Sequence, residues 1–199
     1  MQYPHFFETV ETIKLKDELS EVLGAFSEGI LEISYLDVVK NAGHSCPTTA
    51  GAYLMAREGL KELYQGAIAK RGDVKVYFKE AIEEGTTGVS ANIFSLITGA
   101  TDVWGFKGLG NHYIRKNLMF FQADIPLYVR LQRADTGAMI DMAYHPNRIE
   151  ADVTINALMP KIITENANQE EKKQFMALWQ ARVQNILENF DKVIDYKID

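Results

Sequence analysis

The sequence has 199 residues, of which 47% are hydrophobic and 24% are charged. These proportions are typical of a folded globular protein and exclude a disordered chain. The net charge of −6 argues against nucleic acid as a partner, because phosphate binding requires a concentrated basic face.

The cysteine count and the hydropathy of the sequence exclude further classes of protein. Cys46 is the only cysteine, so internal disulfides and clusters held by four cysteines of one chain are excluded. No apolar run approaches the length of a membrane span, and the first residues lack the basic-then-apolar order of a signal peptide. We therefore expect a cytoplasmic protein with no membrane partner, folded as a single domain over residues 1–199.

The sequence of the first 40 residues predicts a helix, a strand and a helical turn, in that order. An amphipathic helix within residues 1–28 is indicated by the spacing of Leu15, Leu19, Val22 and Phe26. Residues 30–36 are rich in β-branched and aromatic side chains, which is typical of a short strand. A helical turn then follows at 37–40.

The segment after residue 40 combines the lone cysteine with a histidine at a predicted helix start. Asn41-Ala-Gly43 breaks the preceding turn, and Pro47 suits the first position of a helix that extends to Gly66. Cys46 would then lie at the positive end of that helix, which favours a thiolate, with His44 two residues away. The small residues 50–52 would allow another part of the backbone to approach the first turn closely.

The remainder of the chain predicts a sheet region followed by a long helix. Strands are expected at 74–78, 118–121, 127–132 and 138–144, with a buried helix at 89–97 and a glycine-rich loop at 104–113. The last two strands are joined by a connection of hairpin length, which predicts an antiparallel pair. Asn168 and Glu171 form a capping box that opens a C-terminal helical tail at about 165–195. The predicted fold class is α+β: a mixed or antiparallel sheet packed by helices, with a C-terminal amphipathic helix.

Two motifs resemble a known family. His44-Ser-Cys-Pro47 followed by Ala50-Gly-Ala-Tyr53 is similar to the His-x-Cys-Pro-Gly motif of the FmdE family, which is associated with formylmethanofuran dehydrogenase. Thr98-Gly-Ala-Thr101 and Gly105-Phe-Lys-Gly108 look like its second region, so the family-like core covers about 36–125. The resemblance implies an α+β core that is usually a homodimer with a bound metal, often zinc. This chain differs from many members at Ala100, where they carry a second cysteine, at Thr48, where they carry glycine, and in having no cysteine-rich C-terminal zinc finger.

Our first hypothesis is a metal site at the start of the predicted helix. His44 and Cys46 would be ligands, since zinc accepts imidazole and thiolate together, and His112 in the glycine-rich loop would be the third. His145 and Asp141 are weaker candidates. Completion by water would give an open, catalytic-type site.

Two other classes of function remain open. In a metal-free thiol enzyme, Cys46 would be the nucleophile and His44 or His112 its base. In a non-catalytic accessory or small-molecule-binding protein, a cleft between the predicted helix start and the glycine-rich loop would bind a ligand. The candidate ligand-binding residues are Thr48, Trp104, Lys107, Tyr113 and Arg115, of which the two basic ones would attract an anion.

Overall fold

The structure of the protein is a computed structural model that describes residues 2–198. Its helices occupy 44% of the chain and its strands 18%, in two mixed sheets, which confirms the predicted α+β class. The helices and 3-10 turns are η1 (His5–Glu8), α1 (Glu18–Val22), η2 (Ser27–Gly29), α2 (Tyr35–Ala42), α3 (Pro47–Leu63), α4 (Thr87–Thr98), η3 (Pro146–Arg148), α5 (Val153–Ile163), α6 (Gln169–Glu188) and α7 (Phe190–Val193). The strands are β1 (Ile13–Lys16), β2 (Ile30–Ile33), β3 (Ala69–Lys70), β4 (Val74–Phe78), β5 (Met119–Phe120), β6 (Val129–Arg133), β7 (Met139–Tyr144) and β8 (Ile194–Ile198).

The smaller sheet has the order β2-β1-β3, with β1 antiparallel to β2 and parallel to β3. The predicted helix within residues 1–28 is therefore wrong over most of its length. Ile13 and Leu15 are buried and alternate with Lys14 and Lys16, which is the period of a half-buried strand. Only the short α1 remains helical, and Asp17 caps it by accepting a hydrogen bond from the Ser20 N–H at 3.1 Å.

The larger sheet has the order β5-β4-β6-β7-β8. The β6–β7 pair is the predicted antiparallel hairpin, in which Leu131 faces Ile140, and β4 lies antiparallel to β6. The predicted C-terminal helical tail is wrong at its end. Helix α6 stops at Glu188, and β8 pairs antiparallel with β7, so that Ile194 faces Tyr144.

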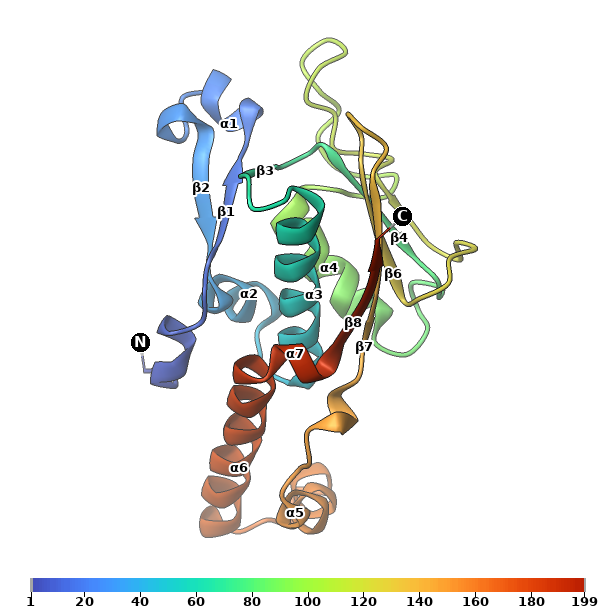
Figure 1. Cartoon of the computed structure of the whole chain (residues 1–199). Coiled ribbons are helices and arrows are strands. Elements are labelled where there is room, and N and C mark those ends of the chain that lie inside the picture. The colour runs from blue at the N-terminus through green and yellow to red at the C-terminus, as the bar shows by residue number, and fades with distance from the viewer. Residues whose placement is uncertain (1, 199) are drawn as a thin grey trace.

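Helix α3 is the centre of the fold. It lies with α4 between the five-stranded sheet and the β1–β2 pair, and α6 packs near its N-terminus (Figure 1). Every residue from Thr49 to Leu60 is buried, so the helix has no solvent face over three turns. The middle of α3 is thus enclosed by neighbouring elements on all sides.

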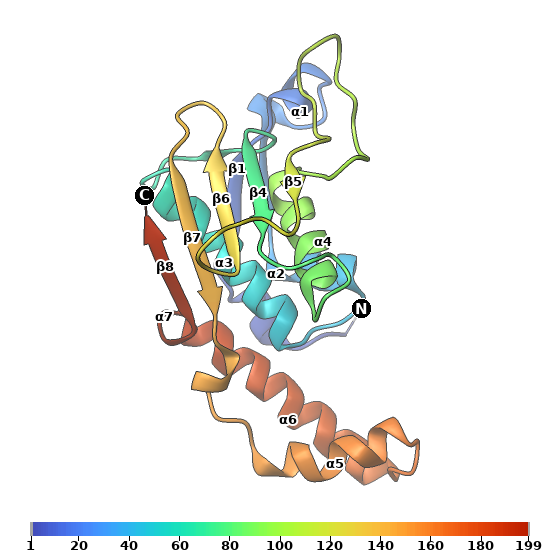
Figure 2. The same ribbon diagram turned by 90° about the vertical axis from the view of Figure 1, so that its right-hand side faces the viewer.

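The C-terminal hairpin of α5 and α6 extends away from this core (Figures 1 and 2). Asn168 caps α6 through the predicted capping box, in which its side chain accepts from the Glu171 N–H at 2.9 Å. The second half of α6 reaches the core, where Val183, Ile186 and Leu187 are buried and Trp179 is partly buried. Of the helices within residues 2–198, none combines the length and apolar character needed to cross a bilayer.

Candidate functional site

The segment that carries His44 and Cys46 links α2 to α3. Gly43 ends α2 in the left-handed conformation, with φ 76°, and the chain then runs extended through Cys46 into the helix. Cys46 is the N-cap of α3, and its Sγ accepts a hydrogen bond from the Thr49 N–H at 3.5 Å. The Cys46 N–H donates in return to Thr49 Oγ1 at 2.9 Å. The thiol therefore lies at the positive end of a long helix, with Pro47 at the first position, as the sequence predicts.

Two other helices hold this segment in place. The Ser45 carbonyl of the segment accepts hydrogen bonds from Trp179 Nε1 at 3.0 Å and Gln180 Nε2 at 3.3 Å, both on α6. The Tyr35 hydroxyl, on α2, lies 3.0 Å from Ser45 Oγ and 3.3 Å from Thr49 Oγ1. The position of the thiol is thus fixed before any ligand arrives.

Two tyrosines lie near the thiol, the buried Tyr35 and the half-buried Tyr144. Burial raises the pKa of Tyr35 to about 12, against smaller opposing effects of the hydrogen bonds to Ser45 and Thr49. Burial also raises the pKa of Tyr144, whose hydroxyl donates to the Pro47 carbonyl at 2.7 Å. The negative charge of a Cys46 thiolate is a smaller cause that also raises both pKa values. Both phenols are neutral near pH 7, as an ordinary tyrosine is, and their raised pKa values leave neither able to act as a base there.

His44 is exposed and has one ring nitrogen engaged. Its Nδ1 lies 3.0 Å from the Ala42 carbonyl oxygen. Because a carbonyl can only accept, Nδ1 must carry the hydrogen, and in the neutral ring Nε2 then carries the lone pair. This is the arrangement in which metal-binding histidines are usually oriented by a backbone carbonyl.

A cavity of about 230 Å³ lies against the first turns of α3. Its walls carry five hydroxyl groups and no charged side chain, and its lining residues are Thr48, Met55, Thr86, Ser90, Tyr128, Tyr144 and Pro146. Gly51 makes room for one wall, because a Cβ there would overlap the Tyr144 ring. The small first turn thus admits an aromatic ring, where the sequence predicts the approach of another backbone. Of the predicted ligand-binding residues, Thr48 is placed at this cavity.

His112 is not brought to His44 and Cys46. In both views the glycine-rich loop projects from the top of the molecule, whereas α3 begins in its middle part (Figures 1 and 2). It is tied there by the hydrogen bond from Thr101 Oγ1 to the Arg115 carbonyl and by the packing of the Arg115 guanidinium against Gly72, just after β3. Across residues 2–198 no three His, Cys, Asp or Glu side chains converge as a metal cage would require. The helix start and this loop line separate cavities, with Thr48 at one of about 230 Å³ and Tyr113 and Arg115 at another of about 180 Å³.

The other predicted ligand-binding residues lie on the glycine-rich loop and just after it, in different surroundings. Arg115 is 6% exposed and donates from Nη2 to Asp17 Oδ1 at 2.7 Å, and Arg71 donates to the other oxygen at 2.9 Å. Arg115 and Tyr113 also line a cavity of about 180 Å³. Trp104 and Lys107 are exposed on the loop, away from that ion-pair network.

The two weaker metal candidates have other partners. Asp141 is fully buried and accepts two hydrogen bonds from Arg130, at 2.9 and 2.7 Å. His145 Nε2 lies 3.1 Å from the Asp195 carboxylate of β8. Each contributes to holding the sheet.

Sequence reasoning misses Tyr35, Tyr144 and Trp179 as neighbours of the thiol. Of these neighbours, only Tyr144 could have been anticipated. A glycine in a buried first turn, here Gly51, indicates that another group packs closely against the helix. No protein-family model matches this sequence, and no curated protein matches it either.

Proposed function

We propose that the protein binds a divalent metal ion, zinc by the chemistry of the donors, through His44 and Cys46, and a small uncharged polar molecule in the adjacent hydroxyl-lined cavity. The observation that carries the proposal is the hydrogen bond from His44 Nδ1 to the Ala42 carbonyl. This hydrogen bond leaves the lone pair of Nε2 available to coordinate a metal. His44 lies two residues from Cys46, whose thiol is fixed at the helix start.

The donor set fits an open site. One imidazole and one thiolate are ligands that zinc accepts together, and two protein ligands leave positions for water or for a bound molecule. A metal held there would supply Lewis-acid polarisation to an oxygen of the bound molecule. Thr49 keeps the thiol sulfur in place. The Tyr144 hydroxyl lines the cavity and can accept a hydrogen bond there, since its own hydrogen is donated to the Pro47 carbonyl.

A metal-free thiol enzyme has less support. The thiol sulfur has one hydrogen-bond partner within residues 2–198, the Thr49 N–H, and no imidazole or carboxylate accepts from it there. The two nearby phenols are neutral near pH 7, and burial raises the pKa of each. The base that such a mechanism requires is therefore missing from the immediate surroundings of the sulfur.

We further propose a homodimer. The chain exposes 10700 Å² of surface. A folded monomer of 22.5 kDa is expected to expose about 9,500 Å². The extra surface is comparable to the roughly 800 Å² that each partner buries in a standard interface. Exposed apolar side chains on the protruding α5–α6 hairpin, Val153, Ile163 and Met176, support that location.

Metal analysis of protein purified without a histidine tag tests the metal proposal. We expect bound zinc in the parent protein, loss of it in His44→Ala and Cys46→Ser, and retention in His112→Ala, which is the matched control. Stoichiometric zinc that persists in both His44→Ala and Cys46→Ser would refute the assignment of these ligands. Loss in His112→Ala would instead restore the three-ligand set that the sequence predicts.

The dimer has its own test. Sedimentation equilibrium should give twice the chain mass for the parent protein and a single chain mass for Ile163→Glu. A parent protein that stays monomeric at high concentration would refute this part of the proposal and leave the metal site untouched.

A further inference from the structure

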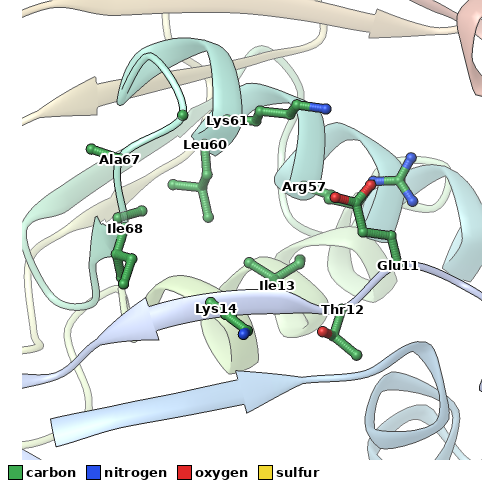
Figure 3. Close-up of a pocket in the computed structure, with 11 residues that line it drawn as sticks. Glu11, Thr12, Ile13, Lys14, Arg57, Leu60, Lys61, Ala67 and Ile68 are labelled. Atoms are coloured by element: carbon green, nitrogen blue, oxygen red, sulfur yellow. The ribbon is translucent and has the colours of Figure 1, made fainter. Parts of the chain in front are cut away.

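A second cavity lies between β1 and the second half of α3, far from the thiol. It has a volume of about 360 Å³, within the range of about 300–1,000 Å³ that is usual for small-molecule sites. Residues of β1 with the segment before it, of α3, and of the connection from α3 to β3 form its walls (Figure 3). Arg57 lies eleven residues after Cys46 on α3, which corresponds to about 16 Å along the helix axis.

One end of this cavity is apolar. Leu60 and Ile13 face each other across its middle, and Ile68 lines its edge (Figure 3). Ile13 and Leu60 are buried, but Ile68 is 48% exposed although it follows a tight turn next to the core. A bound apolar group would cover Ile68 and remove that surface from water.

The other end carries a buried cation with unused donors. Arg57 is 7% exposed, and among residues 2–198 its side chain makes one hydrogen bond, from Nε to Glu58 Oε1 at 2.5 Å. The Phe190 ring covers one face of the guanidinium, with Cζ at 4.9 Å from the ring centroid. The Nη groups have no hydrogen-bond partner in the described chain, and a guanidinium has five N–H donors in total. Lys61 lies on the same side of the cavity, without an ion-pair partner in that part of the chain (Figure 3).

Glu11 occupies the place where an anion would be held. Its carboxylate lies beside the Arg57 guanidinium (Figure 3), yet the closest separation between Arg57 Nε and Glu11 Oε2 is 3.9 Å, and the Glu11 side chain is 64% exposed. Such a pair is weak, because both the distance and the solvent reduce its energy. Glu11 is thus a displaceable internal carboxylate in front of a buried arginine.

We propose that this cavity binds a small monocarboxylate with an aliphatic body. The carboxylate would accept hydrogen bonds from Arg57 and Lys61 and displace Glu11, while the aliphatic part would pack on Leu60 and Ile68. Charge supports an anion. The walls carry Lys14, Arg57 and Lys61 against one carboxylate, Glu11. Arg57 is also paired with Glu58 and Lys14 with Glu32, so Lys61 is the wall cation without an ion-pair partner within residues 2–198.

Calorimetric titration with hexanoate, 1-hexanol and hexylamine tests the inference on protein stripped of metal, so that its outcome is separate from that of the metal site. We expect hexanoate to bind more tightly than the other two compounds. Methyl NMR shifts should concentrate on Leu60 and Ile68. Equal binding of hexanoate and hexanol, absence of hexanoate binding at millimolar concentration, or shifts confined to other methyl groups would each overturn the proposal.

Substitutions at two exposed residues, Lys61 and Glu11, should change the hexanoate affinity in opposite directions without unfolding the protein. Lys61→Gln should weaken hexanoate binding by about twofold to fivefold, the effect of one exposed ion pair. Glu11→Gln should strengthen it by a similar factor, because a competing carboxylate is removed. Lys40→Gln on α2 is the matched control and should have no effect. Weaker or unchanged binding in Glu11→Gln would refute the displacement that the proposal requires.

Discussion

Replacing Asp17 with asparagine should destabilise the protein strongly, because one buried carboxylate serves two arginines. Asp17 is 4% exposed and is the shared partner of Arg71, at 2.9 Å, and Arg115, at 2.7 Å. In Asp17→Asn these two guanidiniums lose their carboxylate while Arg115 stays buried. Removal of one partner from a buried ion pair costs about 3–5 kcal/mol. We expect a loss of that size in the free energy of unfolding.

Urea unfolding followed by tryptophan fluorescence measures this loss. Asp135→Asn is the matched control, since Asp135 pairs with Arg133 at 2.6 Å nearer the surface and should contribute less than about 1 kcal/mol. Adding Arg115→Met to Asp17→Asn should recover part of the stability, because it removes the unpaired buried cation. A loss below about 1 kcal/mol in Asp17→Asn would show that water or a shift of the loop at 99–118 satisfies both arginines.

The same carboxylate should make stability depend on pH. Burial raises the pKa of Asp17, but the hydrogen bonds from Arg71 and the Ser20 N–H and the charge of Arg115 outweigh burial and hold the pKa below its usual range. The unfolded chain therefore binds this proton at higher pH than the folded one does. The stabilisation is complete above the ordinary aspartate value of about 3.9 and is lost as the pH falls through the lowered value in the fold. Asp17→Asn should remove this part of the acid dependence.

Three further substitutions test individual contacts. Gly51→Ala should destabilise by about 1–3 kcal/mol in thermal or urea unfolding, because the new Cβ overlaps the Tyr144 ring, and Gly51→Ala in a Tyr144→Ala background should not add to the cost. Tyr144→Phe removes the hydrogen bond to the Pro47 carbonyl and should cost about 0.5–1.5 kcal/mol in the same assay, whereas no measurable change would mean that water replaces the bond. Asn168→Ala removes the α6 cap and should cost about 1 kcal/mol, with Asn168→Asp as a control that keeps the cap.

Local chemistry explains which elements can be predicted from the sequence. The strand at 74–78 and the β6–β7 hairpin have alternating apolar residues and a glycine-containing turn, so their own side chains specify them. The same holds for the start of α3 and for α6, where a proline at the first position and a capping box act within a few residues. The buried helix predicted at 89–97 is confirmed as part of α4, since its flanking glycines and its length both favour a helix.

Elements specified by distant partners cannot be predicted in this way. Leu15 and Leu19 fit a helical spacing, but Leu15 belongs to a four-residue strand whose partners come from residues 30–33 and 69–70. Strand β8 at the end of the chain exists because β7 offers it an edge. Nothing in the local sequence distinguishes a continued helix from that pairing.

The candidate site shows the same limit. His44 and Cys46 can be placed at a helix start because Pro47 and Thr49 are their immediate neighbours. The prediction that joins His112 to them rests on its place in a second motif, and motif order carries no information on distance. The loop that bears it is anchored instead by Arg115 to Asp17, 98 residues earlier in the chain. Pairings over such separations depend on the whole topology.

The proposed metal site and the proposed carboxylate site both lie on α3, so we can predict whether binding at one affects the other. The helix is buried on every side from Thr49 to Leu60, so a displacement of its start would have to move packed side chains of both sheets. Sites more than about 7–10 Å apart on a rigid element usually act independently, within about 0.3–0.5 kcal/mol. Hexanoate should therefore bind with the same affinity to zinc-loaded and to metal-free protein in the calorimeter. An affinity that changes tenfold with zinc would mean that α3 shifts as a unit between two positions, and that the sites regulate each other through it.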